Sequence, residues 1–312
     1  MAITVFSDIK EPKLFAAYTL EQALAASAVV KSGIVVPDAV LSGALAGGGS
    51  TFNFPSWRHT TEDGTEANVA SFDPTVVATP EKLTARSQVA VRLVRNRAYS
   101  AARLAGVLAG SDPLGAAQAY IGERVAADRQ AALLATIAGV SAKGTLTNDS
   151  QAAFSIGELL ATKGVWGDRA TGNVALAMNS KTKIARQLEN VNTFTPASMT
   201  PIGLDTYLGM PVIVDDKIAD GEIILIEMGA ISMGVAQHAQ PVGIDTNELA
   251  ANGDGVETLV FRDVYSFHVE GTAFVASTAA GLPTDAVLAT AASWDLVAPA
   301  KGVGVLKYKF TA

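Results

Sequence analysis

Two strand-like runs of the chain flank a long polar stretch, and this arrangement predicts a hairpin with no core of its own. The first run spans Thr51–Trp57, and the polar tip RHTTEDGTEAN follows at positions 58–68. The chain then returns through residues 83–93, where odd positions are apolar except Ser87 and most even positions are polar. Such alternation predicts a strand with one buried and one solvated face. Because an isolated two-stranded hairpin is marginally stable in water, we expect this one to lie on another subunit.

The composition agrees with a chain that buries surface against partners. Hydrophobic residues make up 49% of the 312 residues and charged residues only 17%, below the roughly 25% of an ordinary soluble domain. A disordered chain would need the opposite balance. The longest uncharged stretch, residues 39–57, is interrupted by Gly47–Gly49, Asn53 and Pro55, so no membrane-spanning helix is predicted there.

Basic residues cluster in one part of the sequence. Arg86, Arg92, Arg95 and Arg97 lie on or just after the returning strand, and Arg103 follows them. One interpretation is a strand that contacts nucleic acid or an acidic partner surface, and the other is an ordinary solvated strand face. The net charge of −7 argues against a surface built to grip phosphates. Both interpretations of the arginines stay open at this point.

A long helix is predicted for residues 112–139. Asp112 is a typical N-cap, and Pro113 suits the first helical position. About 27 residues at roughly 1.5 Å each make a rod roughly 40 Å long. Its apolar positions include Ile121, and its charged side carries Glu123, Arg124, Asp128 and Arg129.

Helices and strands alternate after the long helix. Ser155 with Glu158 has the spacing of a capping box for a helix that ends near Gly164, and Ser180 is the predicted cap of a helix that ends near Glu189. Strands are predicted at 173–178, 207–214, 223–227, 231–235 and 306–310. Residues 258–269 and 273–277 are predicted to pair as two antiparallel strands.

The residues that catalysis or metal binding would need are missing or scattered. The chain has no cysteine, which excludes thiolate nucleophiles, thiolate metal ligands and disulfides. Its histidines, His59, His238 and His268, are far apart and in no metal-ligand spacing. The glycine run at 47–49 lacks the lysine of a phosphate-binding loop. We therefore predict no catalytic residue, no metal site and no cofactor, and a protein that is not an enzyme.

The order of these parts resembles the major capsid proteins of tailed bacteriophages, which have the Hong Kong 97-type fold. The resemblance starts at about Phe15 and is carried by SGIVVPDAVLSGALAGGGSTFNFPSW, by residues 78–139, and by ALAMNSKTKIARQL, YLGMPVIVDD and FRDVYSFHVEGTAFV. Each stretch alone is degenerate, whereas their order and spacing together are fairly specific.

The resemblance implies an α+β subunit that is divided along the chain. An N-terminal arm would span 1–46, an extended loop 47–98, and a peripheral domain 99–165 with its spine helix at 112–139. An axial domain would span 166–255, and residues 256–312 would supply return strands of the peripheral domain and a C-terminal strand. The tip of the extended loop would contact a neighbouring subunit through Trp57, Arg58, His59, Glu62, Asp63 and Glu66.

The resemblance also implies a function and partners. Copies of the chain would assemble in the host cytoplasm, through pentamers and hexamers, into the icosahedral shell of a virion. Double-stranded DNA would be enclosed rather than specifically bound, and the shell would be built on a portal, with a separate scaffold or decoration protein and no membrane. The alternatives are an encapsulin-like shell of a bacterial nanocompartment and, from another class, a soluble hydrolase or binding protein.

The resemblance raises the question of how neighbouring subunits are locked together. Some members of the family join subunits through an isopeptide bond that uses a lysine of the extended loop. No lysine occurs here between Lys31 and Lys82, so the tip of the loop offers only Arg58 and His59 as basic side chains. Arginine stays protonated and is no amine nucleophile. We therefore expect the shell to be held without covalent links.

Overall fold

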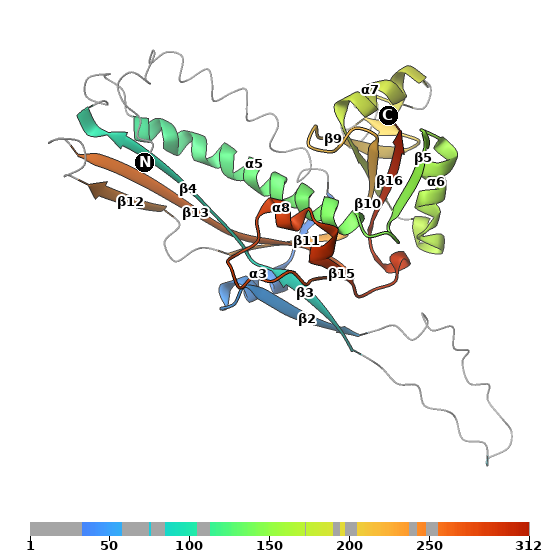
Figure 1. The fold of residues 1–312 in the computed structure, drawn as a ribbon, viewed down its shortest axis with the longest axis horizontal. Helices are drawn as coiled ribbons and strands as arrows, with labels where there is room; N and C mark the ends of the chain where they lie inside the picture. Colours follow the sequence, from blue (N-terminus) through green and yellow to red (C-terminus); the bar gives the residue numbers. More distant parts are fainter. Residues whose placement is uncertain are drawn as a thin grey trace.

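The computed structural model describes residues 33–57, 75, 85–104, 113–171, 173–189, 194–196, 205–236, 242–247 and 255–311 of the chain. Within these residues the strands form three sheets. One sheet lies along a long helix, a second forms the core of a separate body with two shorter helices, and the third carries the hairpin away from both (Figure 1). Most of the predicted N-terminal arm, residues 1–32, lies outside the described part.

The first sheet has five strands, and β13 is its centre. The strands are β1 (Val35–Pro37), β4 (Leu93–Ala102), β11 (Ile231–Ala236), β12 (Val242–Asn247) and β13 (Val256–Val269). β13 pairs antiparallel with β4, β11 and β12, and the short β1 adds to β11 in parallel. The helix predicted for 112–139 is confirmed as α5 (Pro113–Ser141), which runs along β4 and β13 (Figure 1).

The C-terminal half of α5 is the part that enters the core. Leu133 and Ile137 are fully buried there. At Gly139 an added Cβ would lie 2.0 Å from the backbone oxygen of Leu288, at the end of α8 (Asp285–Leu288), and 2.7 Å from the indole nitrogen of Trp294. That indole nitrogen donates a hydrogen bond to the same oxygen, at 2.7 Å. Glycine, a poor helix former, stands in this helix because the chain of α8 passes too close for any side chain.

The second sheet has seven strands and forms the core of the other body. In spatial order they are β5 (Thr147–Ala153), β16 (Val305–Thr311), β10 (Glu222–Glu227), β6 (Val174–Met178), β9 (Met210–Val214), β8 (Thr206–Tyr207) and β7 (Phe194–Thr195). All five residues of β6 are buried, as expected for the middle of a covered sheet. The helix α6 (Ile156–Gly164) packs on β5 and β16, and α7 (Ser180–Glu189) lies at the outer end of this body (Figure 1).

Sheet membership cuts across the predicted boundaries at 166 and 255. The seven-stranded sheet includes β5 and β16, which lie outside the range 166–255. Conversely, β11 and β12 lie inside that range but pair with β13 in the five-stranded sheet. A strand belongs to the sheet in which its hydrogen-bonded partners lie. Because those partners are distant in sequence, boundaries drawn along the chain do not follow the sheets.

The third sheet contains the predicted hairpin arms, and their pairing is confirmed. It runs β15 (Trp294–Leu296), β14 (Thr272–Phe274), β3 (Ala85–Val91) and β2 (Thr51–Trp57). β2 and β3 pair antiparallel from Thr51 with Val91 to Trp57 with Ala85. Within the subunit, burial follows distance from the body rather than the alternation of the sequence, since Ala90 and Val91 are buried but Ala85 and Ser87 are exposed.

Two strand predictions are wrong. Residues 207–214 form two strands instead of one, because Leu208 and Gly209 turn with positive φ angles of 51° and 75° and bring β8 back against β9. The predicted pairing of 258–269 with 273–277 does not form either. β14 pairs instead with β15 and β3, where Phe274 packs edge-to-face on the buried Trp294 with ring centroids 5.3 Å apart.

The helix caps also differ from the predictions in detail. The side chain of Ser155 makes no capping hydrogen bond in α6, and its backbone N–H donates to the hydroxyl of Tyr308 at 3.1 Å. In α7 the cap is Asn179, whose Oδ1 accepts from the backbone N–H of Lys181 at 2.8 Å. In both cases the capping pattern predicts the start of the helix correctly. Which side-chain and backbone groups form hydrogen bonds there depends on the neighbouring residues in the folded chain. The remaining helices are α3 (Ala39–Ala46) and the 3-10 turns Gly167–Thr171, Ala291–Ser293 and Ala300–Gly302.

Candidate assembly surfaces

The hairpin is the first surface that could meet another subunit. Trp57 is the last residue of β2 and lies opposite Ala85 of β3. The other predicted contact residues of the tip lie outside the described residues: Arg58, His59, Glu62, Asp63 and Glu66. Figure 1 shows β2 and β3 leading away from the rest of the molecule. The tip contacts therefore stay a prediction, whereas the direction in which the hairpin arms leave the body is observed.

Gln88 anchors the base of the hairpin to the five-stranded sheet. Its side-chain oxygen accepts two hydrogen bonds, one from Nε2 of His268 at 2.9 Å and one from the backbone N–H of Gly271 at 3.0 Å. These donors belong to β13 and to the turn after it. Gln88 therefore ties β3 to β13 and to the turn that follows it.

His268 is buried at this junction and is neutral near pH 7. Burial lowers the pKa of its imidazole to about 4, and the carboxylate of Asp38 opposes this shift only in part. Because the oxygen of Gln88 can only accept, Nε2 carries the proton in this bond, and among the described residues Nδ1 finds no hydrogen-bond partner. This arrangement gives His268 a structural task, which is to hold Gln88.

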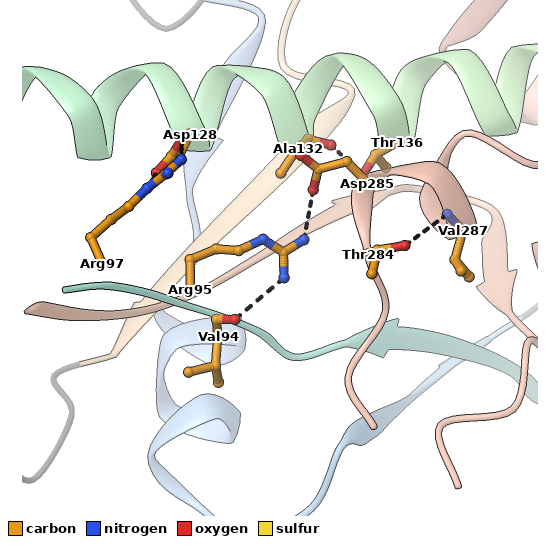
Figure 2. Close-up of polar contacts among 9 residues, drawn as sticks. All are labelled: Val94, Arg95, Arg97, Asp128, Ala132, Thr136, Thr284, Asp285 and Val287. Carbon is orange, nitrogen blue, oxygen red and sulfur yellow. Dashed lines mark hydrogen bonds and ion pairs between the residues drawn. The ribbon is translucent and has the colours of Figure 1, made fainter. Parts of the chain in front are cut away.

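The predicted basic strand is engaged within its own chain. Arg92 donates from Nη2 to the backbone oxygen of Leu45 at 2.7 Å, and its guanidinium lies 5.3 Å from the ring centroid of Phe52. Figure 2 shows Arg95 reaching Asp285 of α8, at 2.6 Å, and Arg97 reaching Asp128 of α5. Arg97 binds both carboxylate oxygens, at 2.8 and 2.6 Å, and this bond raises the pKa of its guanidinium.

A further ion pair joins the long helix to the central strand. Arg129 of α5 binds both carboxylate oxygens of Asp263 on β13, each at 2.7 Å. The guanidinium also lies 5.7 Å from the ring centroid of Tyr265, and the hydrogen bond to Asp263 raises the pKa of Arg129. Burial raises the pKa of the Tyr265 hydroxyl. Bidentate pairs of this kind fix geometry as well as charge, so they hold α5 in one position on the sheet.

These contacts favour the structural interpretation of the basic cluster over a nucleic-acid contact. Arg103 also has a carboxylate partner, Glu257 of β13, at 2.9 Å. Arg86 lies on β3 opposite Ser56. An arginine whose guanidinium is bound to a carboxylate of its own chain has little charge left for phosphate.

The other predicted residues of α5 are placed as follows. Ile121 is buried, as its apolar position predicts. Arg124 lies 3.9 Å from Asp128, one helical turn away. One carboxylate oxygen of Glu123 is buried and has no hydrogen-bond partner among the described residues. Asp112 lies outside the described residues. The charged side of α5 therefore faces β4 and β13 through Asp128 and Arg129.

Sequence reasoning missed a set of large apolar side chains that the subunit leaves exposed. Those at least 40% exposed are Val36, Val40, Leu104, Leu160, Val165, Ile184, Leu188, Val235 and Val275. Ile184 and Leu188 are one helical turn apart on α7, and this i, i+4 spacing was the signal available in the sequence. A single exposed apolar residue means little, but a pair on one face of a helix indicates a contact surface.

Two kinds of feature, metal-ligand groups and membrane-spanning helices, were sought in the part of the chain that the structure describes. No group of three or more metal-ligating side chains gathers there. None of the helices in the described ranges is long and apolar enough to cross a membrane.

Comparison with known proteins identifies the family. Residues 64–305 match the family described as Gp13-like, major capsid protein 13-like. The major capsid protein of Bacillus phage SPP1 is 30% identical over 330 residues, covering 99% of this chain and 98% of that protein. Both matches concern major capsid proteins, the second that of a phage, and they do not favour a nanocompartment shell or a hydrolase.

Solved structures show the same fold at low sequence identity. A structure from Mycobacterium phage Patience is 10% identical, with a TM-score of 0.61 over 100% of this chain and 93% of that one. The capsid asymmetric unit of cyanophage Pam1 is also 10% identical, with a TM-score of 0.55 over 87% of each chain. The α+β arrangement predicted from the resemblance, the Hong Kong 97-type fold, is therefore confirmed. From the family match over most of its length, the near full-length relative and the shared fold, this chain belongs to the Gp13-like major capsid proteins of tailed phages.

Proposed function

We propose that copies of this major capsid protein assemble through pentamers and hexamers into a closed icosahedral shell that encloses double-stranded DNA. The observation that carries the proposal is the β2–β3 hairpin, which leaves the body with Ala85 and Ser87 exposed. A hairpin of this kind is marginal on its own. A neighbouring subunit supplies the surface on which it lies, and the tip residues at 58–66 make the contact.

We further propose that the two bodies of the subunit have different places in the shell. The seven-stranded sheet with α6 and α7 is the axial unit, whose tip surrounds the centres of pentamers and hexamers. The five-stranded sheet with α5 as its spine helix is the peripheral unit. This division follows hydrogen-bonded pairing, which makes β5 and β16 part of the axial unit.

The role of the chain is structural, and the DNA is enclosed without being gripped. Arg92, Arg95 and Arg97 bind acceptors of their own chain, and an acidic chain repels phosphate. His268, the one histidine in the described residues, is buried and neutral and serves as a hydrogen-bond donor to Gln88. We infer that the protein is not an enzyme, because the family it belongs to consists of major capsid proteins, and we propose that it uses no cofactor and has no membrane partner.

Other partners follow from the function of a shell. Assembly takes place in the host cytoplasm and begins on a portal, and a separate scaffold or decoration protein controls closure or reinforces the surface. The contacts within the shell are noncovalent, because the tip of the extended loop, residues 58–68, has no lysine and the nearest lysines along the chain are Lys31 and Lys82.

The test is the size and shape of the purified protein. Negative-stain microscopy and sedimentation should show closed shells or five- and six-fold capsomers, whereas a soluble enzyme or binding protein would run as a small particle. Deleting residues 58–68 should leave folded subunits that fail to close into shells. Normal particles from the deletion variant would refute the proposed role of the hairpin.

A further inference from the structure

One turn of α5 carries side chains that bond to both bodies of the subunit. The ion pairs of Asp128 and Arg129 described above join the helix to β4 and β13 of the five-stranded sheet. The next residue, Gln130, donates from Nε2 to a carboxylate oxygen of Asp215, in the turn that follows β9 of the seven-stranded sheet. Because successive residues of a helix point about 100° apart, these contacts leave α5 in different directions.

Asp215 is a fixed point of the seven-stranded body. Its backbone N–H donates to the backbone oxygen of Met178, at the end of β6, at 3.1 Å. Its second carboxylate oxygen accepts from the backbone N–H of Lys217 at 2.9 Å, and its backbone oxygen accepts from that of Ile218 at 3.1 Å. The carboxylate therefore cannot move relative to α5 unless the turn and the end of the sheet move with it.

Stability alone does not account for a glutamine at position 130. Gln130 is 6% exposed, and its Oε1 has no hydrogen-bond partner among the described residues. A buried polar atom without a partner costs free energy that an apolar side chain of similar size would avoid. The contribution of Gln130 is therefore one of geometry, because a hydrogen bond depends on direction as well as distance.

The apolar packing between the two bodies lacks this dependence on direction. Leu133 and Ile137 of α5 belong to one continuous core with Leu176 of β6 and Phe267 of β13. In Figure 1 the C-terminal end of α5 reaches the seven-stranded body. Apolar burial is non-directional, so this core resists separation of the bodies more strongly than a small change in the angle between them.

We propose that the hydrogen bond between Gln130 and Asp215 sets the angle between the two bodies and thereby the curvature of the shell; this inference rests on the shell-forming function proposed above. The bond ties α5 to the seven-stranded body next to the residue that ties it to β13, Arg129. Closure of a ring requires a defined rotation from one subunit to the next. A spread of angles within the subunit would therefore disturb closure without unfolding the chain.

Gln130→Met tests the proposal, because methionine has a similar length but cannot donate a hydrogen bond. Circular dichroism should show a folded subunit with a cooperative melting transition, since the apolar core is unchanged. The yield of closed particles of wild-type diameter, measured by sucrose gradient and negative-stain microscopy, should fall at least fivefold, with open or irregular particles in their place. Lys217→Gln changes an exposed side chain of the same turn and is the matched control, which should assemble normally.

Reversing the polarity of the bond separates the angle from packing. Gln130→Glu alone places two carboxylates side by side and should reduce the yield of closed particles at least as much as Gln130→Met. Gln130→Glu combined with Asp215→Asn again provides one donor and one acceptor, in the opposite order, and should restore the yield to within twofold of the wild type. A combined variant as defective as Gln130→Glu alone would contradict the proposal.

The angle can be measured directly, because the chain has no cysteine and introduced cysteines are its only labelling sites. Spin labels at Asn96→Cys on β4 and Ala161→Cys on α6, both exposed positions, report the distance between the bodies by double electron–electron resonance. In unassembled subunits Gln130→Met should broaden the distance distribution, and the combined variant should narrow it again.

The results distinguish this inference from the function on which it rests. A distance distribution of wild-type width from Gln130→Met, or shells at wild-type yield from it, would overturn the inference and leave the shell function standing. Failure of the wild-type chain to form any large particle would instead refute the proposed function.

Discussion

Removing the charge of Asp263 should loosen the long helix from the central sheet and destabilise the subunit. Arg129 and Asp263 are 26% and 10% exposed and share two hydrogen bonds of 2.7 Å. Breaking a fully buried pair costs about 3–5 kcal/mol, because the partner is left charged and unpaired. Since the guanidinium of Arg129 keeps some access to water, we expect Asp263→Asn to lower the free energy of unfolding by about 2–3 kcal/mol.

The double variant separates the ion pair from ordinary packing. Arg129→Met with Asp263→Leu removes both charges and keeps apolar volume, so its free energy of unfolding should lie within about 1 kcal/mol of the wild type. The two changes should therefore be strongly non-additive. Lys181→Gln is the matched control, because Lys181 lies 3.9 Å from Asp220 at the surface and such pairs contribute about 0–1 kcal/mol.

Urea unfolding of unassembled subunits measures these differences. The buried Trp166 and Trp294 report unfolding through their fluorescence, and an unchanged dependence on urea concentration would show that the transition is the same one. The reasoning is refuted if Asp263→Asn unfolds within about 0.5 kcal/mol of the wild type, or if the double variant loses the sum of the losses of Arg129→Met and Asp263→Leu measured singly.

Three further predictions concern pH, packing and covalent links. Burial lowers the pKa of His268 to about 4 in the folded protein, whereas the same imidazole in the unfolded chain binds a proton below about pH 6.5. The free energy of unfolding should therefore decrease as the pH falls from 6.5 to 4. His268→Gln should remove this part of the pH dependence in urea unfolding. Gly139→Ala should lower the melting temperature, because the clash with the backbone oxygen of Leu288 outweighs a helix-propensity gain of about 1 kcal/mol. The control Gly164→Ala should not lower it, because there is open space around Gly164. Particles boiled in detergent should give a single band at the subunit mass on a denaturing gel, and a ladder of multimers would contradict a noncovalent shell.

Local signals in the sequence were sufficient to place the main elements. The Asp112-Pro113 pair predicted the start of α5, which begins at Pro113, and two strand-like runs predicted the β2–β3 hairpin. Caps, turns and periodicity act over a few residues, so they can be read without knowing the fold. The same signals failed at Leu208-Gly209, where the chain turns inside what reads as one strand.

Only the tertiary structure decided what the charged and apolar side chains of these elements do. The arginines of β4 predict a basic strand, but each is bound to a carboxylate that is distant in sequence. The partner of Arg97 lies 31 positions away and that of Arg95 lies 190 positions away. Arg129 and Asp263 are separated by 134 positions. The sequence of α7 likewise indicates two sides but not which one faces inward. Periodicity identifies the sides of a helix or strand, whereas burial depends on which distant segments pack against them, and for this protein on neighbouring subunits as well.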